Sequence, residues 1–233
     1  MNEPFDVQDE LARFTGHAPL FPLPNVVLFP HMWLPLHVFE PRYRQLAEDA
    51  LAGDRLIAMA MFEPNWEALY DTKLPKLHPV VGLGRIELDE SLSGGRFHLT
   101  LRGLCRARIV AELDLPEPYR SAELKLLPDR YSEYETIDRA NRQRELLAGA
   151  LELMPELNAA PVLHKLMEAD IPLGVLCDLI AHSLQLSPDD AQELLSEIDV
   201  DSRSDLVLQF LRQRCRGRAA GLMERFPPEF SCN

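Results

Sequence analysis

Apolar residues occupy every odd-numbered position but one between Phe97 and Leu113, and most of the even positions between them are polar. This two-residue period predicts a half-buried strand, or two strands joined at a bend, because strand side chains point alternately to opposite faces. Gly103 is the exception, and a glycine inside a strand commonly marks a bulge or a barrel corner. The segment therefore predicts a long β element that bends near its middle.

Three other segments before residue 130 have the composition of strands, namely 32–38, 56–62 and 80–88. A Ser-Gly-Gly sequence at 93–95 separates the last of them from the long element and predicts a hairpin. Pro35 predicts an edge strand or a bulge, because proline has no N–H to donate to a neighbouring strand. A twisted sheet of about six strands either exposes its edges or closes into a barrel, and closure is the commoner solution.

One short helix is predicted within this β-rich region. Pro41 suits the first helical turn, where its missing N–H would have no partner, and Gly53 suits the C-terminal cap. The apolar residues between them recur at helical spacing. The segment 63–79 contains three prolines and little periodicity, so we expect a long surface loop there.

After residue 130 the apolar residues follow a helical period of 3.6. Capping signals mark three helix starts: Ser132 with Glu135, Ser187 followed by Pro188, and Ser202 with Asp205. An apolar stripe marks a fourth helix: Leu173, Leu176, Leu179, Ile180 and Leu184. We therefore predict an α+β fold in four parts: an extension over 1–18, a β-barrel over 19–129, a helical bundle over 130–218 and a tail over 219–233.

Motifs for catalysis and for nucleotide binding are missing from the sequence. A Walker A phosphate loop needs Gly-Lys, and the chain has no such pair; it also has no Gly-x-Ser-x-Gly elbow. None of the lysines lies in the context of a Ser–Lys dyad. His31 and His37 would share one face of an unbroken strand, but the cysteines and the other histidines have no metal-ligand spacing. We expect no enzymatic activity, no metal site and no cofactor.

The net charge of −13 repels phosphate backbones and so disfavours nucleic acid as a partner. RNA binding remains an alternative, because Arg102, Arg106 and Arg108 share the predicted polar face of the long β element and Arg96 extends it. The longest apolar run is too short to span a membrane, and the amino terminus lacks the features of a signal peptide. We expect a cytoplasmic protein that does not bind membranes.

Several motifs resemble the N-terminal domain of Lon proteases. Leu-Phe-Pro-Leu-Pro-Asn-Val-Val-Leu-Phe-Pro at 20–30, followed by Leu-Pro-Leu at 34–36, resembles the opening of that domain. Phe-Glu-Pro-Arg-Tyr-Arg at 39–44 is similar to the free-standing bacterial branch of the family. The segments 81–86 and 103–109 are similar to two of its strands.

The resemblance continues into the helical half, from Leu176 to Arg203, and in all covers about residues 19 to 215. It implies a PUA-like pseudo-barrel followed by a helical bundle, in a domain that recruits unfolded or tagged polypeptides for separate ATPase and Ser–Lys peptidase domains. Those two domains have no counterpart in this sequence. The expected function is therefore a non-catalytic polypeptide-binding module, an adaptor or quality-control factor with a full-length protease as a further partner, and peptidase activity is the weakest alternative.

Binding of unfolded chains requires apolar surface that is open to solvent. Four aromatic residues in the β-rich half are candidates for such a surface: Trp33, Phe39, Trp66 and Tyr70. The last two lie in the predicted loop. For each of the four, packing in the core is the alternative role.

Overall fold

The computed structural model describes residues 7–70, 72–133, 137–153, 171–184 and 186–225. The chain divides into two compact units, one of Met1–Asp129 with Ala181–Ile198 and one of Arg130–Ile180 with Asp199–Asn233. The predicted capping residue Glu135 and the end of the predicted tail, 226–233, lie outside the described residues. Each unit is described by itself.

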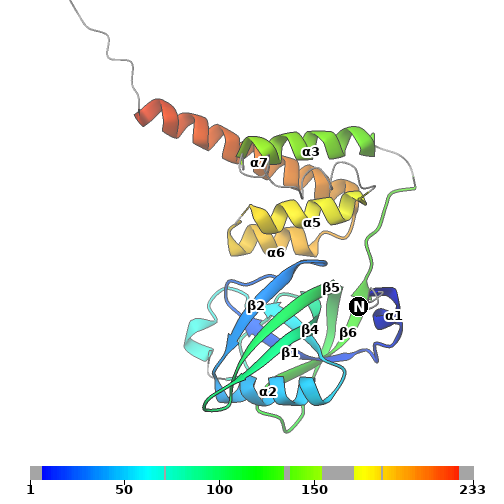
Figure 1. The fold of residues 1–233 in the computed structure, drawn as a ribbon, viewed down its shortest axis with the longest axis vertical. Coiled ribbons are helices and arrows are strands. Elements are labelled where there is room, and N and C mark those ends of the chain that lie inside the picture. The colour runs from blue at the N-terminus through cyan, green and yellow to red at the C-terminus, as the bar shows by residue number, and fades with distance from the viewer. Residues whose placement is uncertain (1–6, 71, 134–136, 154–170, 185, 226–233) are drawn as a thin grey trace, which may run out of the picture. The chain divides into compact units, whose positions relative to one another are not determined.

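The first unit is built around a six-stranded sheet (Figure 1). Its strands are β1 (His17–Leu23), β2 (Trp33–Val38), β3 (Leu56–Met61), β4 (Val80–Leu92), β5 (Arg96–Leu113) and β6 (Arg120–Leu127). The strand order is β2-β5-β4-β3-β1-β6, and β6 also pairs with β5, so the five strands from β5 to β6 form a closed ring. The strand β2 pairs with β5 alone, which makes it an edge strand and suits Pro35.

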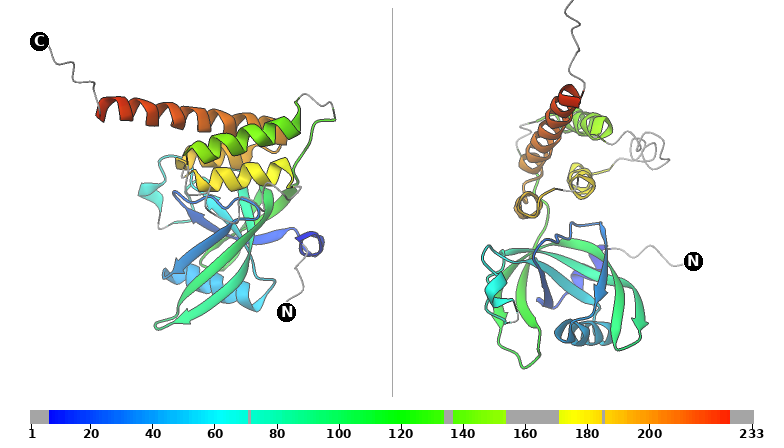
Figure 2. Two further views of the ribbon diagram at one scale, coloured as in Figure 1. Left: turned by 45° about the horizontal axis from the view of Figure 1, so that its top comes forward. Right: turned by 90° about the vertical axis from the view of Figure 1, so that its left-hand side faces the viewer.

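A helix and a loop complete this unit in the way that the sequence predicts. The helix α2 (Pro41–Ala52) begins at a proline and ends at Gly53, whose N–H donates to the carbonyl of Asp49 at 3.0 Å. Figures 1 and 2 show α2 lying across one end of the barrel. Among the described residues of the loop after β3, Glu67–Leu69 form the short 3₁₀ helix η1. A further helix, α1 (Val7–Ala12), is not predicted; Leu11, within it, packs against the core, so the predicted extension is partly folded.

The odd-numbered apolar residues of β5 pack in two different cores, which lie on opposite faces of the strand. Phe97, Leu99 and Leu101 pack in a core with α2, whereas Ala107 and Ile109 pack in a second core. The reason is a bulge: Gly103 pairs with Gly84 and Cys105 pairs with Leu83, so Leu104 is an extra residue. One extra residue moves every later side chain to the opposite face.

Three glycines make room for a chain segment that crosses the sheet. A Cβ atom on Gly82 would lie 2.0 Å from the carbonyl oxygen of Leu28, and one on Gly103 would lie 2.1 Å from that of Phe29. A Cβ atom on Gly84 would lie 2.5 Å from the end of the Leu28 side chain, a less severe contact. The crossing segment is then fixed by hydrogen bonds from His31 N–H to Gly103 and from Gly103 N–H to Met32, both 2.8 Å long. The glycines therefore hold the start of β2 against β5.

The helix α6 (Pro188–Ser196), which the sequence analysis places in the helical bundle, groups with the barrel instead. Its start is predicted correctly: Ser187 accepts a hydrogen bond from the Asp190 N–H at 3.2 Å. Gln192 is buried and donates to the carbonyl of Val80 in β4 at 2.9 Å. A capping pattern marks where a helix starts, but it carries no information about which unit the helix joins.

The second unit contains α3 (Arg139–Leu153), α5 (Leu173–Ser183, through Ile180) and α7 (Val200–Arg225). The predicted caps Ser132 and Ser202 are both wrong. The carboxylates of Asp138 and Asp199 accept the capping hydrogen bonds instead, from the N–H groups of residues 141 and 202. Ion pairs link the helices: Arg139 binds Asp201 through two hydrogen bonds of 2.8 Å, and the buried Arg203 lies 3.6 Å from Asp178.

Candidate functional site

Two of the four candidate aromatic residues lie on the outer surface of the barrel. The side chain of Trp33 is 52% exposed and that of Phe39, just beyond the end of β2, is 59% exposed. Alternate residues of a strand share a face, so Trp33, Pro35 and His37 point to the same side of β2. The ring of Phe39 stacks on that of His37, with 5.8 Å between centroids. This places both candidates on one surface.

The neighbouring strands extend this surface. Pro35 pairs with Thr100 in β5, and Thr100 pairs with Leu88 in β4, so these three residues form a row across the sheet. Leu88 is 64% exposed, which is unusual for a large aliphatic side chain and was not singled out in the sequence. We call the surface formed by Trp33, Pro35, Phe39 and Leu88 the β2 face.

The other two candidates, Trp66 and Tyr70, form a separate aromatic cluster with the buried Phe62. The ring centroids of Trp66 and Tyr70 lie 5.4 Å and 5.9 Å from that of Phe62 and 5.5 Å from each other. The Tyr70 hydroxyl donates to Glu40 at 2.6 Å, and its pKa is raised by burial and by that hydrogen bond. Trp66 and Tyr70 are half-buried, and their contacts fix the loop after β3 to the start of α2.

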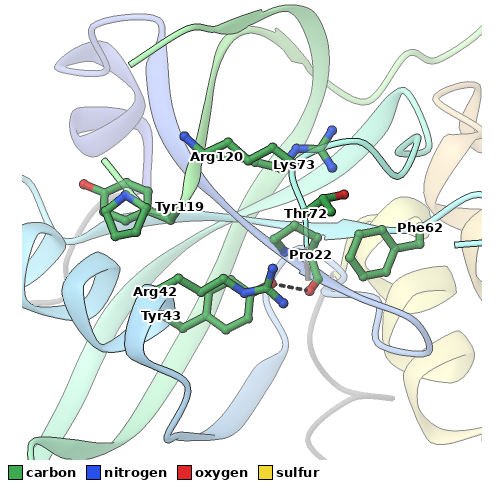
Figure 3. A pocket seen from close by; sticks show the side chains of 9 residues that line it. Pro22, Arg42, Tyr43, Phe62, Thr72, Lys73, Tyr119 and Arg120 are labelled. Atoms are coloured by element: carbon green, nitrogen blue, oxygen red, sulfur yellow. Dashed lines mark hydrogen bonds between the residues drawn. The ribbon is translucent and has the colours of Figure 1, made fainter. Parts of the chain in front are cut away.

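A small cleft lies beside this cluster (Figure 3). Its lining comes from β1, α2, the loop after β3 and the start of β6: Pro22, Arg42, Tyr43, Phe62, Thr72, Lys73, Pro118, Tyr119 and Arg120. The Tyr43 hydroxyl donates to the carbonyl of Pro22 at 3.2 Å, and burial raises the pKa of this phenol. Among the described lining residues three are cationic and none is acidic, although the Tyr119 hydroxyl donates to the carboxylate of Asp49 at 2.7 Å; we call it the cationic cleft. No sequence pattern indicates this cleft, because its lining residues come from four separate segments of the chain.

The arginine row that kept RNA binding as an alternative is not continuous on the surface. Arg106 is only 1% exposed, and its guanidinium donates to the carbonyl of Leu195 at 2.9 Å and contacts Asp129 at 3.4 Å. Arg102 is paired with Glu87 at 2.6 Å. The prediction that Arg106 lies on an exposed polar face is therefore wrong, because the end of α6 and Asp129 cover its guanidinium, whereas Arg108 on the same side of β5 is exposed.

The structure brings no metal-ligating cluster together among the described residues. His31 has a positive φ of 66° and precedes β2, so it does not continue the strand that carries His37. The His37 ring instead lies 4.9 Å from that of His98, which contacts Glu90 at 3.4 Å. In the described part of the chain, no helix has both the length and the apolar character that crossing a membrane requires.

We expect Cys105 to resist alkylation by iodoacetamide at about pH 8 in the folded protein, because the thiolate is the reactive form. Burial raises the pKa of its thiol from the ordinary value of about 9.0 to about 12, and the nearby Arg106 lowers it by less. The unfolded thiol ionises first, so this group's contribution to stability is lost as the pH rises from about 9 toward 12. Mass spectrometry of native and urea-unfolded protein measures the labelling, and rapid native labelling would contradict the expectation.

The closed barrel with its helices defines a class of protein: an α+β domain built on a small β-barrel. The chain belongs to the family of substrate-binding domains of the ATP-dependent protease La (LON), whose family model matches residues 17–213. Lon protease 2 of Sorangium cellulosum is 32% identical over 199 residues, or 82% of this chain. Lon protease 2 of Myxococcus xanthus is 30% identical over 200 residues, or 84% of this chain. The chain spans only 24% and 23% of the length of these two proteins.

Solved structures show the same fold. The N-terminal domain of Mycobacterium avium complex Lon protease has a TM-score of 0.67 at 16% identity, and the match covers 84% of this chain and 98% of that one. A Lon N-terminal domain protein from Xanthomonas campestris has a TM-score of 0.57 at 23% identity, covering 83% and 97%. The predicted α+β class and the resemblance to the Lon N-terminal domain are both confirmed.

Proposed function

We propose that this chain is a non-catalytic module that binds polypeptides through the β2 face. The observation that carries the proposal is the exposure of Trp33, Phe39 and Leu88 on one side of the sheet. Large apolar side chains gathered on the outer surface of a barrel expose area that a partner's apolar residues can bury. Membership of a substrate-binding domain family supports the same reading.

The clients that fit this surface are unfolded or tagged polypeptides, because these present apolar side chains that folded proteins bury. The β2 strand is also an edge, although Pro35 removes one donor from it. Side-chain contacts on the face, rather than strand addition, would therefore carry most of the affinity. In the cell, the chain would act as an adaptor or quality-control factor, with a full-length protease as its second partner.

Fluorescence polarisation with fluorescein-labelled β-casein, a polypeptide without a stable fold, tests the proposal. We expect the double substitution Trp33→Ala with Phe39→Ala to weaken binding at least about tenfold, because exposed aromatic anchors dominate such interfaces. Both residues are exposed, so the fold should be retained.

Two matched controls sharpen this test. Val110→Ala removes an exposed aliphatic group from the far half of β5 and should change the affinity less than about twofold. The double substitution of Trp66 and Tyr70 by alanine tests whether the aromatic cluster also contacts the client. Unchanged binding of casein to the Trp33 and Phe39 variant would place the client elsewhere and remove the β2 face from the proposal.

A further inference from the structure

The second unit contains a groove between α3 and α7. These two helices lie side by side (Figures 1 and 2) and run in the same direction: Arg139 contacts Asp201, and further along both helices Gly149 approaches Leu211. The approach is close, since a Cβ atom on Gly149 would lie 3.3 Å from the end of the Leu211 side chain. The groove has a volume of about 430 Å³, which falls within the range of about 300–1,000 Å³ that is usual for ligand pockets.

The two rims of this groove carry opposite charges. Glu145 and Glu152 form the rim on α3, whereas Arg212 and Arg216 form the rim on α7, and all four side chains are exposed. The residues between the rims are apolar or small, and they recur along each helix at a spacing that keeps them on one side. We call this surface the α3–α7 groove; its lining residues are Glu145, Ala148, Gly149, Glu152, Leu208, Leu211, Arg212, Cys215 and Arg216.

The charges on the rims are only partly compensated within the chain. Glu145 lies 3.7 Å from Arg142. Within the described residues, Glu152, Arg212 and Arg216 form no ion pair. Arg212 and Arg216 are four residues apart on α7, where like charges repel, and Glu152 lies in the last turn of α3, where the helix dipole disfavours an acid. These three charges do not stabilise their own helices, whereas partners of opposite charge would stabilise each of them.

We propose that the α3–α7 groove binds one amphipathic helix of a partner protein, whose apolar face is flanked by basic residues on one side and acidic residues on the other. A helix packs along the groove between two others through apolar side chains spaced three or four residues apart. Its basic flank would face Glu145 and Glu152, and its acidic flank would face Arg212 and Arg216. The opposite charges of the rims also fix the direction in which the bound helix runs. This inference is independent of the β2 face and of the proposed function.

Fluorescence polarisation with three labelled helical peptides tests this inference at about 150 mM salt, where exposed charges act only at short range. The peptides share one alanine-rich sequence with leucine at every third or fourth position. The first has arginine on one flank of the leucines and glutamate on the other, the second has arginine on both flanks, and the third has glutamate on both. We expect the wild type to bind the mixed peptide at least about fivefold more tightly than either of the others, because each of those meets one rim of like charge.

The net charge of −13 attracts any basic peptide, so tightest binding of the all-arginine peptide by the wild type would indicate unspecific attraction and overturn the inference. Arg212→Glu with Arg216→Glu makes both rims acidic and should reverse the preference, so that the all-arginine peptide binds most tightly. Arg108→Glu with Lys125→Glu is the matched control: it changes the net charge equally at two exposed positions of the barrel and should keep the preference for the mixed peptide.

Ala148→Phe tests the groove without a change of charge. Ala148 is exposed and lines the groove, so a ring there should occupy it and weaken binding of the mixed peptide at least about tenfold. Ala140→Phe, at an exposed position of the same helix outside the groove, should change the affinity less than about twofold. Far-UV circular dichroism checks that the variants keep their helices. Absence of binding by all three peptides, or binding that either groove variant leaves unchanged, overturns the inference, whereas casein binding through the β2 face is measured separately and does not depend on it.

Discussion

Replacing Gly103 by alanine should lower the free energy of unfolding of the barrel by at least about 3 kcal/mol, because a backbone clash inside a packed core cannot be relieved by a rotamer change. The new Cβ would lie 2.1 Å from the Phe29 carbonyl oxygen and 3.2 Å from the Cα of Pro30. Relief of this clash would break the two 2.8 Å hydrogen bonds that join Gly103 to His31 and Met32. The start of β2 would move with them, so polypeptide binding should weaken too.

Urea unfolding followed by tryptophan fluorescence measures this loss in the right unit, since both tryptophans of the chain, Trp33 and Trp66, belong to the barrel unit. Gly94→Ala is the control: it lies at a turn with φ of +78° and nothing within 4 Å of the new Cβ, so it should cost only about 1 kcal/mol. Equal losses in the two variants would show that close approach of the chain at Gly103 is not what requires glycine there.

The second large effect is expected at Arg106, where substitution by methionine should destabilise the barrel by about 3 kcal/mol. The guanidinium is almost fully buried, and its removal leaves the carbonyl of Leu195 and the carboxylate of Asp129 without this donor. Loss of one partner from a buried polar network costs more than the network contributes as a whole, because the remaining groups stay desolvated.

Arg108→Met makes a closely matched comparison, with the same chemical change two residues further along β5 at an exposed position. It should alter the free energy of unfolding by less than about 0.5 kcal/mol. The same urea titration serves both variants. A small effect at Arg106 would mean that the ends of α6 and β6 do not depend on this guanidinium for their attachment to the barrel.

These two residues also decide where the candidate site lies. Gly103 fixes the crossing segment that leads into β2, and the bulge beside it lets the first half of β5 carry the β2 face while the second half carries buried Arg106. Of the four aromatic candidates, Trp33 and Phe39 could be proposed from alternation with polar and proline neighbours. The role of Trp66 and Tyr70 could not, because their spacing in an aperiodic loop gives no indication of a contact with Phe62.

The sequence by itself determined most of the segments that become strands and helices and the residues that begin and end a few of them, whereas α1 and the caps at Asp138 and Asp199 were not predicted. Alternation along 97–113, Pro41 with Gly53, and Ser187 with Pro188 act over one or two turns of chain, and such local patterns can be recognised without knowing the neighbours. The family resemblance rests on the same local motifs. These features were enough to reach the fold class and the substrate-binding family.

Only the tertiary structure decided which faces meet. A bulge of one residue at Leu104 turns the odd-numbered apolar series from one core to the other, an outcome that depends on pairing with β4, and the end of α6 covers Arg106. Likewise α6 joins the barrel because Gln192 finds the carbonyl of Val80, more than a hundred residues away in the sequence. Register and pairing are set by contacts between distant segments, and their effect on a side chain's environment cannot be read from the period of a single strand or helix.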